Sequence, residues 1–390
     1  MRLIFLMIAT LTLSTTTLAA QCGGSFDGFV KTLKSQAREL GYSNRLVDAF
    51  FANVELDPNV IKADRSQGVF QLPFLEFSNR LISKHRRDHG AKNLTKYRSV
   101  FDRIERDYGI SPGVLTAFWA FETDYGAFQG DYNTLNALVT LSHDCRRPEL
   151  FRPQVFAALE LFNRGDFDPI QTTGAWAGEI GMVQMLPGDI IESGIDGDGD
   201  GLVSLKTSVP DALLSGAHML SNLGWTPHEP WLQEVIVPND LPWAETGLDK
   251  QKTVRAWQRL GVKARDGNLG PATLSASIIL PQGRKGPAFI AYPNFQIYFE
   301  WNQSFVYVTT AAYFANRLEG ASPYIAGAPD AALSGAEMKD LQSRLQKLGY
   351  DVGKIDGILG AKTRAAVQDV QQQLGVPADA WPTRELLDRL

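Results

Sequence analysis

The chain has 390 residues, which predicts two domains, or one large domain and one small one. Hydrophobic residues make up 44% of it and charged residues 21%, as in an ordinary globular protein with a large buried core. The net charge of −5 excludes the basic composition that proteins use to hold nucleic-acid phosphates, so no nucleic acid is expected as a partner.

Residues 1–20 have the pattern of a secretory signal peptide. An apolar run from Leu3 to about Leu13 leads into small residues that end at Ala20. The run is too short for a transmembrane helix, so we predict cleavage after Ala20 and export to the periplasm. Cys22 raises the alternative of a lipid anchor. Gln21 stands where a lipidation motif has a small residue, so a soluble exported protein is favoured.

The chain has two cysteines, Cys22 and Cys145. In an oxidising compartment an even number of cysteines favours a disulfide, which would fasten the mature N-terminus to the main domain. The alternative is two unrelated thiols, one of them buried.

From Ser25 to about Leu223 the apolar residues recur every three or four positions, and the runs stop at glycine or a turn. This period predicts a mostly helical domain. In the segment SPGVLTAFWAFETDYG, Ser111 is the predicted N-cap and Pro112 suits the first helical turn. Gly126 is the predicted stop.

Glu122 lies near the end of this predicted helix, on the face that carries Phe118, Trp119 and Tyr125. Apolar surroundings and the negative end of the helix dipole both stabilise the neutral acid. An acid with a raised pKa can protonate a leaving oxygen near neutral pH. The alternative is an ordinary glutamate that points to water, which this window alone favours.

The motif GAWAGEIGMVQMLP, residues 174–187, combines small residues with a polar amide. Its glycines would allow close approach of backbone or substrate. Gln184 could bond to hydroxyl or acetamido groups of a sugar, while Trp176, Tyr125 and Phe128 could supply aromatic faces. The alternative is helix packing through small residues.

The stretch IDGDGDGLVSL has the alternating aspartates of an EF-hand calcium loop, namely Asp196, Asp198 and Asp200. Thr207 stands where such loops place a bidentate glutamate, so Asp211 is the expected final carboxylate. Oxygen ligands favour Ca²⁺ over a transition metal, and we predict a structural calcium ion of modest affinity. The alternative is a turn without metal.

Between residues 232 and 308 the helix-like and strand-like pieces mix. The stretches at 289–299 and 304–310 are rich in aromatic and β-branched residues and are predicted to be short strands or their edges. Residues 307–318, however, could also begin a helix.

Residues 321–334 are rich in Gly, Ala, Pro and Ser and are the predicted linker. Residues 335–390 contain two amphipathic helices around a turn-rich centre. A block of about 55 residues is small but can fold alone.

Six motifs follow one another along the chain: ETDYG, TLNALVTLS, CRRPELF, GAWAGEIGMVQMLP, the DGDGDG loop and LPQGRKGPAFIAYPNFQIYFEWNQS. In this order they resemble the lytic murein transglycosylases of the membrane-bound transglycosylase B type. Residues 335–390 resemble the small peptidoglycan-binding domain of many cell-wall enzymes. The resemblance implies a mainly α fold. A lysozyme-like catalytic domain with a small α/β insertion would span residues 21–320, and a small three-helix peptidoglycan-binding domain residues 335–390.

The resemblance also implies cleavage of the β-1,4 bond between N-acetylmuramic acid and N-acetylglucosamine. Glu122 matches the family's single catalytic acid, which protonates the glycosidic oxygen and then takes a proton from the C6 hydroxyl of the muramoyl residue. That hydroxyl closes onto C1 to give a 1,6-anhydro sugar, whereas ordinary glycosidases pair two carboxylates. Gln184 and Asn302 match residues of the family's cleft, and the four aspartates match its calcium loop.

No organic cofactor is implied by the resemblance. Peptidoglycan glycan strands are the implied partner, and other cell-wall enzymes could be further partners. Two positions depart from the family pattern, because Ala175 stands where serine is common and Met219 where tyrosine is common. Both would lie where polar groups of the substrate are held. Glu179 could be a second carboxylate of the cleft, although a position facing solvent or an arginine is favoured.

Two other functions stay open. A muramidase would use water and leave a reducing end, and a non-catalytic peptidoglycan-binding or scaffold protein would need only the C-terminal block. If that block serves only to bind the wall, deletion of residues 335–390 should weaken wall affinity and spare turnover of soluble fragments.

Overall fold

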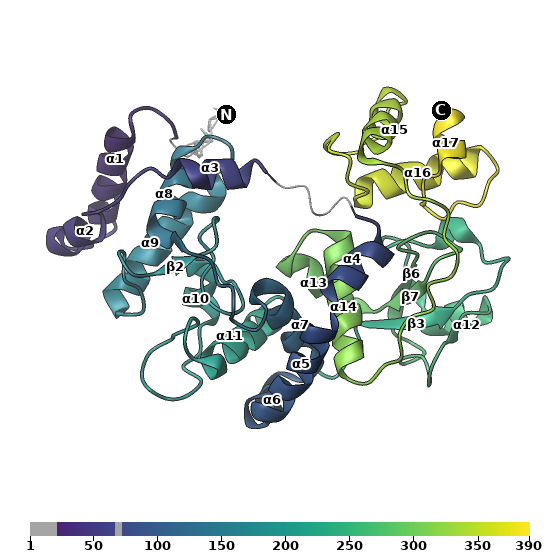
Figure 1. Ribbon diagram of the computed structural model, residues 1–390, viewed down its shortest axis with the longest axis horizontal. Coiled ribbons are helices and arrows are strands. Elements are labelled where there is room, and N and C mark those ends of the chain that lie inside the picture. The colour runs from purple at the N-terminus through teal and green to yellow at the C-terminus, as the bar shows by residue number, and fades with distance from the viewer. Residues whose placement is uncertain (1–21, 67–71) are drawn as a thin grey trace, which may run out of the picture.

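The computed structural model describes residues 22–66 and 72–390, and it is mainly helical, as predicted (Figure 1). The predicted signal peptide lies outside the described residues. None of the described helices combines the length and the apolar character that a membrane span requires.

In the first helical unit, at the left of Figure 1, three N-terminal helices pack against two helices from later in the chain. They are α1 (Phe26–Glu39), α2 (Asn44–Phe50), α3 (Pro58–Asp64), α8 (Thr134–His143) and α9 (Pro148–Arg164). Phe50 of α2 lies against Phe162 of α9, with ring centroids 5.7 Å apart. The Asp64 side chain is buried and forms ion pairs with Arg146 and Arg147. The two arginines of the CRRPELF motif therefore fasten α3 to the start of α9.

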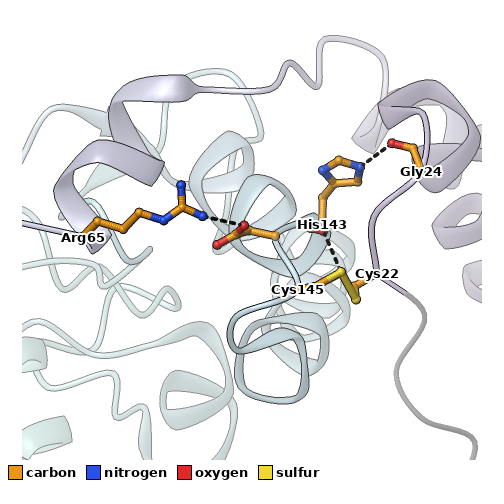
Figure 2. The surroundings of a disulfide bond; sticks show 6 residues. Cys22, Gly24, Arg65, His143 and Cys145 are labelled. Atoms are coloured by element: carbon orange, nitrogen blue, oxygen red, sulfur yellow. Dashed lines mark hydrogen bonds and ion pairs between the residues drawn. A yellow bond between two sulfur atoms is a disulfide. The ribbon is translucent and has the colours of Figure 1, made fainter. Parts of the chain in front are cut away.

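The N-terminal segment is attached to the loop between α8 and α9 (Figure 2). A disulfide joins Cys22 to Cys145, with a Cα–Cα distance of 5.3 Å, which is the pairing that the cysteine count favours. The backbone N–H of Gly23 donates to the carbonyl oxygen of His143 at 2.9 Å. The His143 ring also lies 3.0 Å, through Nε2, from the carbonyl oxygen of Gly24.

We expect the double variant Cys22→Ser with Cys145→Ser to lose about 2–5 kcal/mol of unfolding free energy. The bridge closes a loop with a sequence separation of 123 residues, so its removal frees much of the unfolded chain. Urea unfolding of the variant and of the oxidised protein measures the difference. Equal midpoints and slopes in the two curves would contradict the expectation.

Helix α7 (Pro112–Thr123) lies at the centre of the molecule. Every residue from Gly113 to Ala120 is buried, because α7 packs against α14 and against α5, α6 and α11. The surrounding helices are α4 (Phe74–Leu81), α5 (Lys84–Lys96), α6 (Arg98–Tyr108), α10 (Pro187–Ser193), α11 (Val209–Asn222), α13 (Pro293–Trp301) and α14 (Phe305–Leu318).

The start of α7 differs in one respect from the prediction. Ser111 occupies the N-cap position, but its side chain makes no capping bond to the helix. Its hydroxyl donates instead to the carboxylate of Glu319, which also accepts the backbone N–H of Gly113 at 3.1 Å. A carboxylate from beyond the end of α14 thus supplies the cap that the serine was expected to supply.

The predicted α/β insertion is present as a five-stranded antiparallel sheet in the order β4-β6-β7-β3-β5. Its elements are β3 (Leu232–Ile236), the 3₁₀ helix η2 (Trp243–Glu245), β4 (Lys252–Thr253), α12 (Val254–Arg259), β5 (Lys263–Ala264), β6 (Ser275–Ile279) and β7 (Ala288–Ala291). Trp257 of α12 is fully buried against this sheet and donates through Nε1 to the carbonyl oxygen of Ala276 at 2.8 Å. A second, two-stranded sheet pairs β1 (Tyr132–Asn133) with β2 (Thr173–Gly174).

The prediction of short strands or their edges at 289–299 and 304–310 is wrong for most of these residues, whereas the alternative that residues 307–318 form a helix is confirmed. Only residues 288–291 form a strand, while residues 293–301 form α13 and residues 304–310 cap and begin α14. Aromatic and β-branched residues favour strands only where they pack on a sheet surface. Here they are buried between helices, and that tertiary packing overrides the weak local preference.

The C-terminal domain consists of three helices, as predicted: α15 (Gly335–Lys347), α16 (Ala361–Gln373) and α17 (Arg384–Asp388). Leu341, Leu345 and Val367 are fully buried in its own small core. The segment 319–334 contains no helix or strand. It is fastened to the α/β insertion, because the N–H of Ala328 donates to the carbonyl oxygen of Lys285 at 2.9 Å.

Candidate active site

Glu122 lies in the last turn of α7, which ends at Thr123. Asp124 and Tyr125 then take left-handed backbone conformations, with φ of 50° and 63°, and turn the chain away from the helix. The Thr123 hydroxyl donates to the carbonyl oxygen of Met182 at 2.6 Å. The end of α7 is therefore held against the glycine-rich motif.

The carboxyl group of Glu122 accepts two hydrogen bonds on the same oxygen. The Tyr307 hydroxyl donates to Oε1 at 2.5 Å, and the Trp301 indole N–H donates to it at 3.0 Å. Among the described residues, no donor reaches the other oxygen, Oε2. The residue as a whole is half-buried, and protein surrounds its carboxyl group closely enough to disfavour the charged form.

Burial raises the pKa of Glu122 from 4.5 to about 7. The hydrogen bonds from Tyr307 and Trp301 act in the opposite direction, because they stabilise the charged form, and the negative charge of Glu179 adds to the increase. Burial also raises the pKa of the Tyr307 hydroxyl well above 10, so this group stays protonated and keeps donating. Glu122 is thus about half protonated at pH 7 and a largely neutral acid below it.

Two of the predicted sugar-binding residues, Tyr125 and Gln184, lie around the end of α7, and one polar group of each is already engaged. The Tyr125 hydroxyl donates to the carbonyl oxygen of Arg86 at 2.6 Å. Gln184, in a left-handed backbone conformation with φ of 55°, donates through Nε2 to the carbonyl oxygen of Gly181 at 2.8 Å. Trp176 is half-buried and packs against the main core. Tyr125 therefore offers its ring rather than its hydroxyl.

Asn302 follows Trp301 directly and ends α13. Its Oδ1 accepts the backbone N–H of Ser304 at 2.9 Å. The Ser304 hydroxyl oxygen in turn accepts the backbone N–H of Tyr307 at 3.4 Å. Asn302 thus shapes the short turn that carries both donors to Glu122.

The sequence favours a position of Glu179 that faces solvent or an arginine, and the side chain lies close enough to Arg147 to feel its charge. It is largely enclosed, and its Oε2 is buried without a hydrogen-bond partner among the described residues. Burial raises the pKa of this carboxyl group as well, while the nearby charge of Arg147 lowers it. The buried Oε2 of Glu179 is therefore closed off from a substrate.

Three of the four predicted calcium ligands come together. One carboxylate oxygen from each of Asp196, Asp198 and Asp211 lies within 4.8 Å of the others. Asp200 is outside this group among the described residues, and its Oδ1 accepts the N–H of Leu202 at 2.9 Å. The loop is connected to the glycine-rich motif rather than to Glu122 directly, since the N–H of Met182 donates to the carbonyl oxygen of Leu205.

Residues 25–316 match the family model for the transglycosylase SLT domain. The chain therefore belongs to the SLT transglycosylase family. Residues 334–390 match the model for a peptidoglycan binding domain. The match to the SLT domain covers the helical unit, the end of α7, the aspartate loop and the α/β insertion.

The chain resembles several known proteins. SltB3 from Pseudomonas aeruginosa, in a crystal structure in complex with NAG-anhNAM-pentapeptide, is 34% identical with a TM-score of 0.86, over 94% of this chain and 99% of that chain. Slt35, an Escherichia coli lytic transglycosylase in complex with calcium, is 21% identical with a TM-score of 0.66, over 78% and 97% of the two chains. These likenesses confirm the expected lysozyme-like fold.

Membrane-bound lytic murein transglycosylase B from Escherichia coli (strain K12) is 25% identical over 233 residues, or 59% of this chain. The chain spans 63% of the length of that relative.

Sequence reasoning on the SLT domain missed Trp301 and Tyr307. They lie 179 and 185 residues from Glu122 along the chain, so no local pattern connects them to it. Tyr307 also falls within a stretch that was predicted as a strand. The one available signal was Asn302, which was singled out and stands beside Trp301.

We expect Tyr307→Phe to lower turnover about 10- to 100-fold, the equivalent of one hydrogen bond of about 1.5–3 kcal/mol to a charged group. Without this donor the pKa of Glu122 should rise further, so the basic limb of the pH–rate profile moves to higher pH. Tyr350→Phe, which changes a hydroxyl group of the C-terminal domain, is the control. An unchanged basic limb in Tyr307→Phe would show that the hydroxyl does not act on Glu122.

Proposed function

We propose that this protein is a lytic transglycosylase that cleaves the β-1,4 bond between N-acetylmuramic acid and N-acetylglucosamine and leaves 1,6-anhydromuramoyl ends. The observation that carries the proposal is the Glu122 carboxyl group, with a pKa of about 7 and two donors on one oxygen. The complexes of SltB3 with NAG-anhNAM-pentapeptide and with NAG-NAM-pentapeptide support the substrate class.

In the first step Glu122 acts as general acid. Because Oε1 already accepts hydrogen bonds from Tyr307 and Trp301, the proton of the neutral carboxyl group belongs on Oε2. Oε2 gives this proton to the glycosidic oxygen as the bond from that oxygen to C1 breaks. The carboxylate that forms is stabilised by the two donors already in place, which need no rearrangement.

In the second step the same carboxylate acts as base. It accepts the proton of the C6 hydroxyl group while the C6 oxygen forms a bond to C1. The acid is regenerated, a 1,6-anhydro ring forms, and no water is consumed. A two-carboxylate hydrolase would need a second ionised group beside the sugar. Glu179 does not suit that role, because its Oε2 is enclosed by protein.

We further propose that Gln184, Trp176, Tyr125 and Asn302 bind the glycan around Glu122. The Trp176 and Tyr125 rings are half-buried, so each has a surface available for a sugar face. The Asn302 Oδ1 is occupied in the turn before α14, so its Nδ2 is the group free to donate to a substrate.

A calcium ion fits the aspartate loop, where we propose that it is structural. Three carboxylates supply the hard oxygen ligands that Ca²⁺ prefers, and Asp211 is fully buried at their centre. When bound, the ion would supply the positive charge that offsets the repulsion between these carboxylates. No organic cofactor is proposed.

Export to the periplasm through residues 1–20 is also part of the proposal. The disulfide supports it, since such bonds persist in oxidising compartments. It also supports the absence of a lipid anchor, because the sulfur atom of Cys22 is bonded to Cys145. Peptidoglycan glycan strands would be the partner of the whole chain, and other cell-wall enzymes are possible further partners.

Mass spectrometry of products from purified sacculi, digested in water labelled with heavy oxygen, tests the proposal. We expect muropeptides with anhydro ends, one water lighter than reducing ends and free of the label. Labelled reducing ends would establish a muramidase instead. Binding without any product would leave only a wall-adhesion protein.

A further inference from the structure

One arginine of α16 is central to the contact between the C-terminal domain and the SLT domain. The Arg364 guanidinium donates through Nη2 to the carbonyl oxygen of Pro281 at 2.7 Å and through Nη1 to that of Leu280 at 3.4 Å. It lies over the ring of Phe305, with the central guanidinium carbon 4.5 Å from the ring centroid. The same guanidinium carbon lies 5.9 Å from the ring centroid of Trp381, a residue of the C-terminal domain.

The Arg364 guanidinium is buried in a specific interface between the two domains. Its Nε is buried without an acceptor among the described residues, and burial lowers the pKa of the guanidinium to about 10. Two further contacts flank it: the Gln368 Nε2 donates to the carbonyl oxygen of Thr246 at 2.9 Å, and the Asp379 carboxylate accepts the N–H of Arg284 at 3.0 Å. Burying a cation costs desolvation free energy, so a buried guanidinium needs hydrogen bonds and ring contacts that compensate for this loss.

Phe305 connects this contact to the proposed active site. It is the first residue of α14 and is only 8% exposed. It lies within the short turn between Trp301 and Tyr307, the two donors to Glu122. The same turn is held by two further hydrogen bonds, in which the N–H of Ser304 donates to Asn302 Oδ1 and the N–H of Tyr307 donates to the Ser304 hydroxyl oxygen. A shift of the Phe305 ring would therefore move the residues on which both donors depend.

We propose that the C-terminal domain positions the active site, with Arg364 holding Phe305 so that Trp301 and Tyr307 keep their places on Glu122. The domain is then part of the catalytic unit as well as a wall-binding module. This inference rests on the proposed function of Glu122. It reverses the expectation that deletion of residues 335–390 spares turnover of soluble fragments, because the deletion would also remove the support of Phe305.

The test compares two full-length variants that each remove one positive charge from α16. Arg364→Gln removes the contact with Phe305, whereas Lys362→Gln changes an exposed side chain that forms an ion pair with Asp351 of its own domain. The substrate is a soluble, uncross-linked glycan fragment released from purified sacculi, so wall affinity does not enter the rate.

For Arg364→Gln we expect kcat to fall about 10- to 100-fold, as small displacements of catalytic groups do, with KM nearly unchanged. The basic limb of the pH–rate profile should move to higher pH, because loosened hydrogen bonds from Tyr307 and Trp301 no longer lower the pKa of Glu122. Lys362→Gln should match the unmodified protein. Equal kcat and equal basic limbs in the two variants would overturn the inference.

Two measurements keep the test decisive. Hydrogen exchange of the amides of residues 303–309 should be faster in Arg364→Gln than in Lys362→Gln, and this readout needs no activity. If exchange is faster but the unmodified protein shows no turnover, the proposed catalytic role of Glu122 is contradicted and the Arg364–Phe305 contact is supported. If exchange is unchanged, the proposed effect of that contact on the turn is contradicted. Phe305→Leu should reproduce the loss of kcat, and adding Arg364→Gln to it should cause little further loss. Multiplicative losses would show that the two residues act independently.

Discussion

Glu122→Gln is expected to lower turnover of soluble glycan about 10²- to 10⁴-fold, the range that general acids contribute. The glutamine Oε1 can still accept from Tyr307 and Trp301, so the local geometry should be preserved. An amide, however, has no acidic proton to give to the glycosidic oxygen and cannot take one back. Clearing of purified cell wall should stop, while binding to sacculi persists.

The matched control is Glu300→Gln, an exposed glutamate beside Trp301. It should retain full turnover. Undiminished clearing by Glu122→Gln would remove this residue from its proposed role. Equal losses in the two variants would point to a general effect of charge near α13.

The difference in unfolding free energy between the wild-type protein and Glu122→Gln should also depend on pH. The pKa of Glu122 is about 7 in the folded protein and 4.5 without burial, so the folded state binds more protons between these values. Wild-type stability therefore falls, relative to Glu122→Gln, as the pH rises from about 4.5 to about 7, and the difference is constant above that range. Chemical unfolding at several pH values measures it. A difference that does not change with pH would contradict the raised pKa.

Asp211→Asn is expected to destabilise the SLT domain and to abolish its response to calcium. The Asp211 carboxylate is fully buried and accepts the N–H of Gly197 at 2.9 Å on one oxygen and that of Ser204 at 2.8 Å on the other. An asparagine would set its own NH₂ group against one of these donors. A buried donor left unpaired costs about 1–3 kcal/mol, and loss of the ion adds to this.

Thermal unfolding with calcium or with a chelator measures both effects. The wild-type midpoint should rise with calcium and fall with the chelator, whereas that of Asp211→Asn should respond to neither. Asp200→Asn is the control, since Asp200 lies outside the group of three carboxylates and should keep the response. A wild-type midpoint that ignores calcium would leave the loop as a turn without metal.

The features that could be predicted are those encoded by short segments. The helical period, the position of Ser111 before α7 and the acid near the end of that helix all follow from neighbouring residues. The aspartate loop is local too, and even the replacement of the usual glutamate by Asp211 could be read from its spacing. The strand prediction failed over α13 and at the start of α14, because burial decides against the strand preference of these residues, while the helical alternative for residues 307–318 is confirmed.

The parts that could not be predicted depend on long-range contacts. Trp301 and Tyr307 reach Glu122 only because α13 and α14 fold back beside α7. The exclusion of Asp200 from the carboxylate group depends on the path of the loop, and the capping of α7 depends on Glu319. The contact of Arg364 with Phe305 joins two domains, and neither segment alone indicates it.

The most direct test of the central claim is the pKa of the Glu122 carboxyl group, measured by carbon NMR as the difference between the wild-type protein and Glu122→Gln across a pH titration. Enclosure by α7, α13 and α14 predicts a value of about 7. A value near 4.5, typical of a glutamate in water, would contradict the account, because such a group is already ionised where an acid must hold its proton.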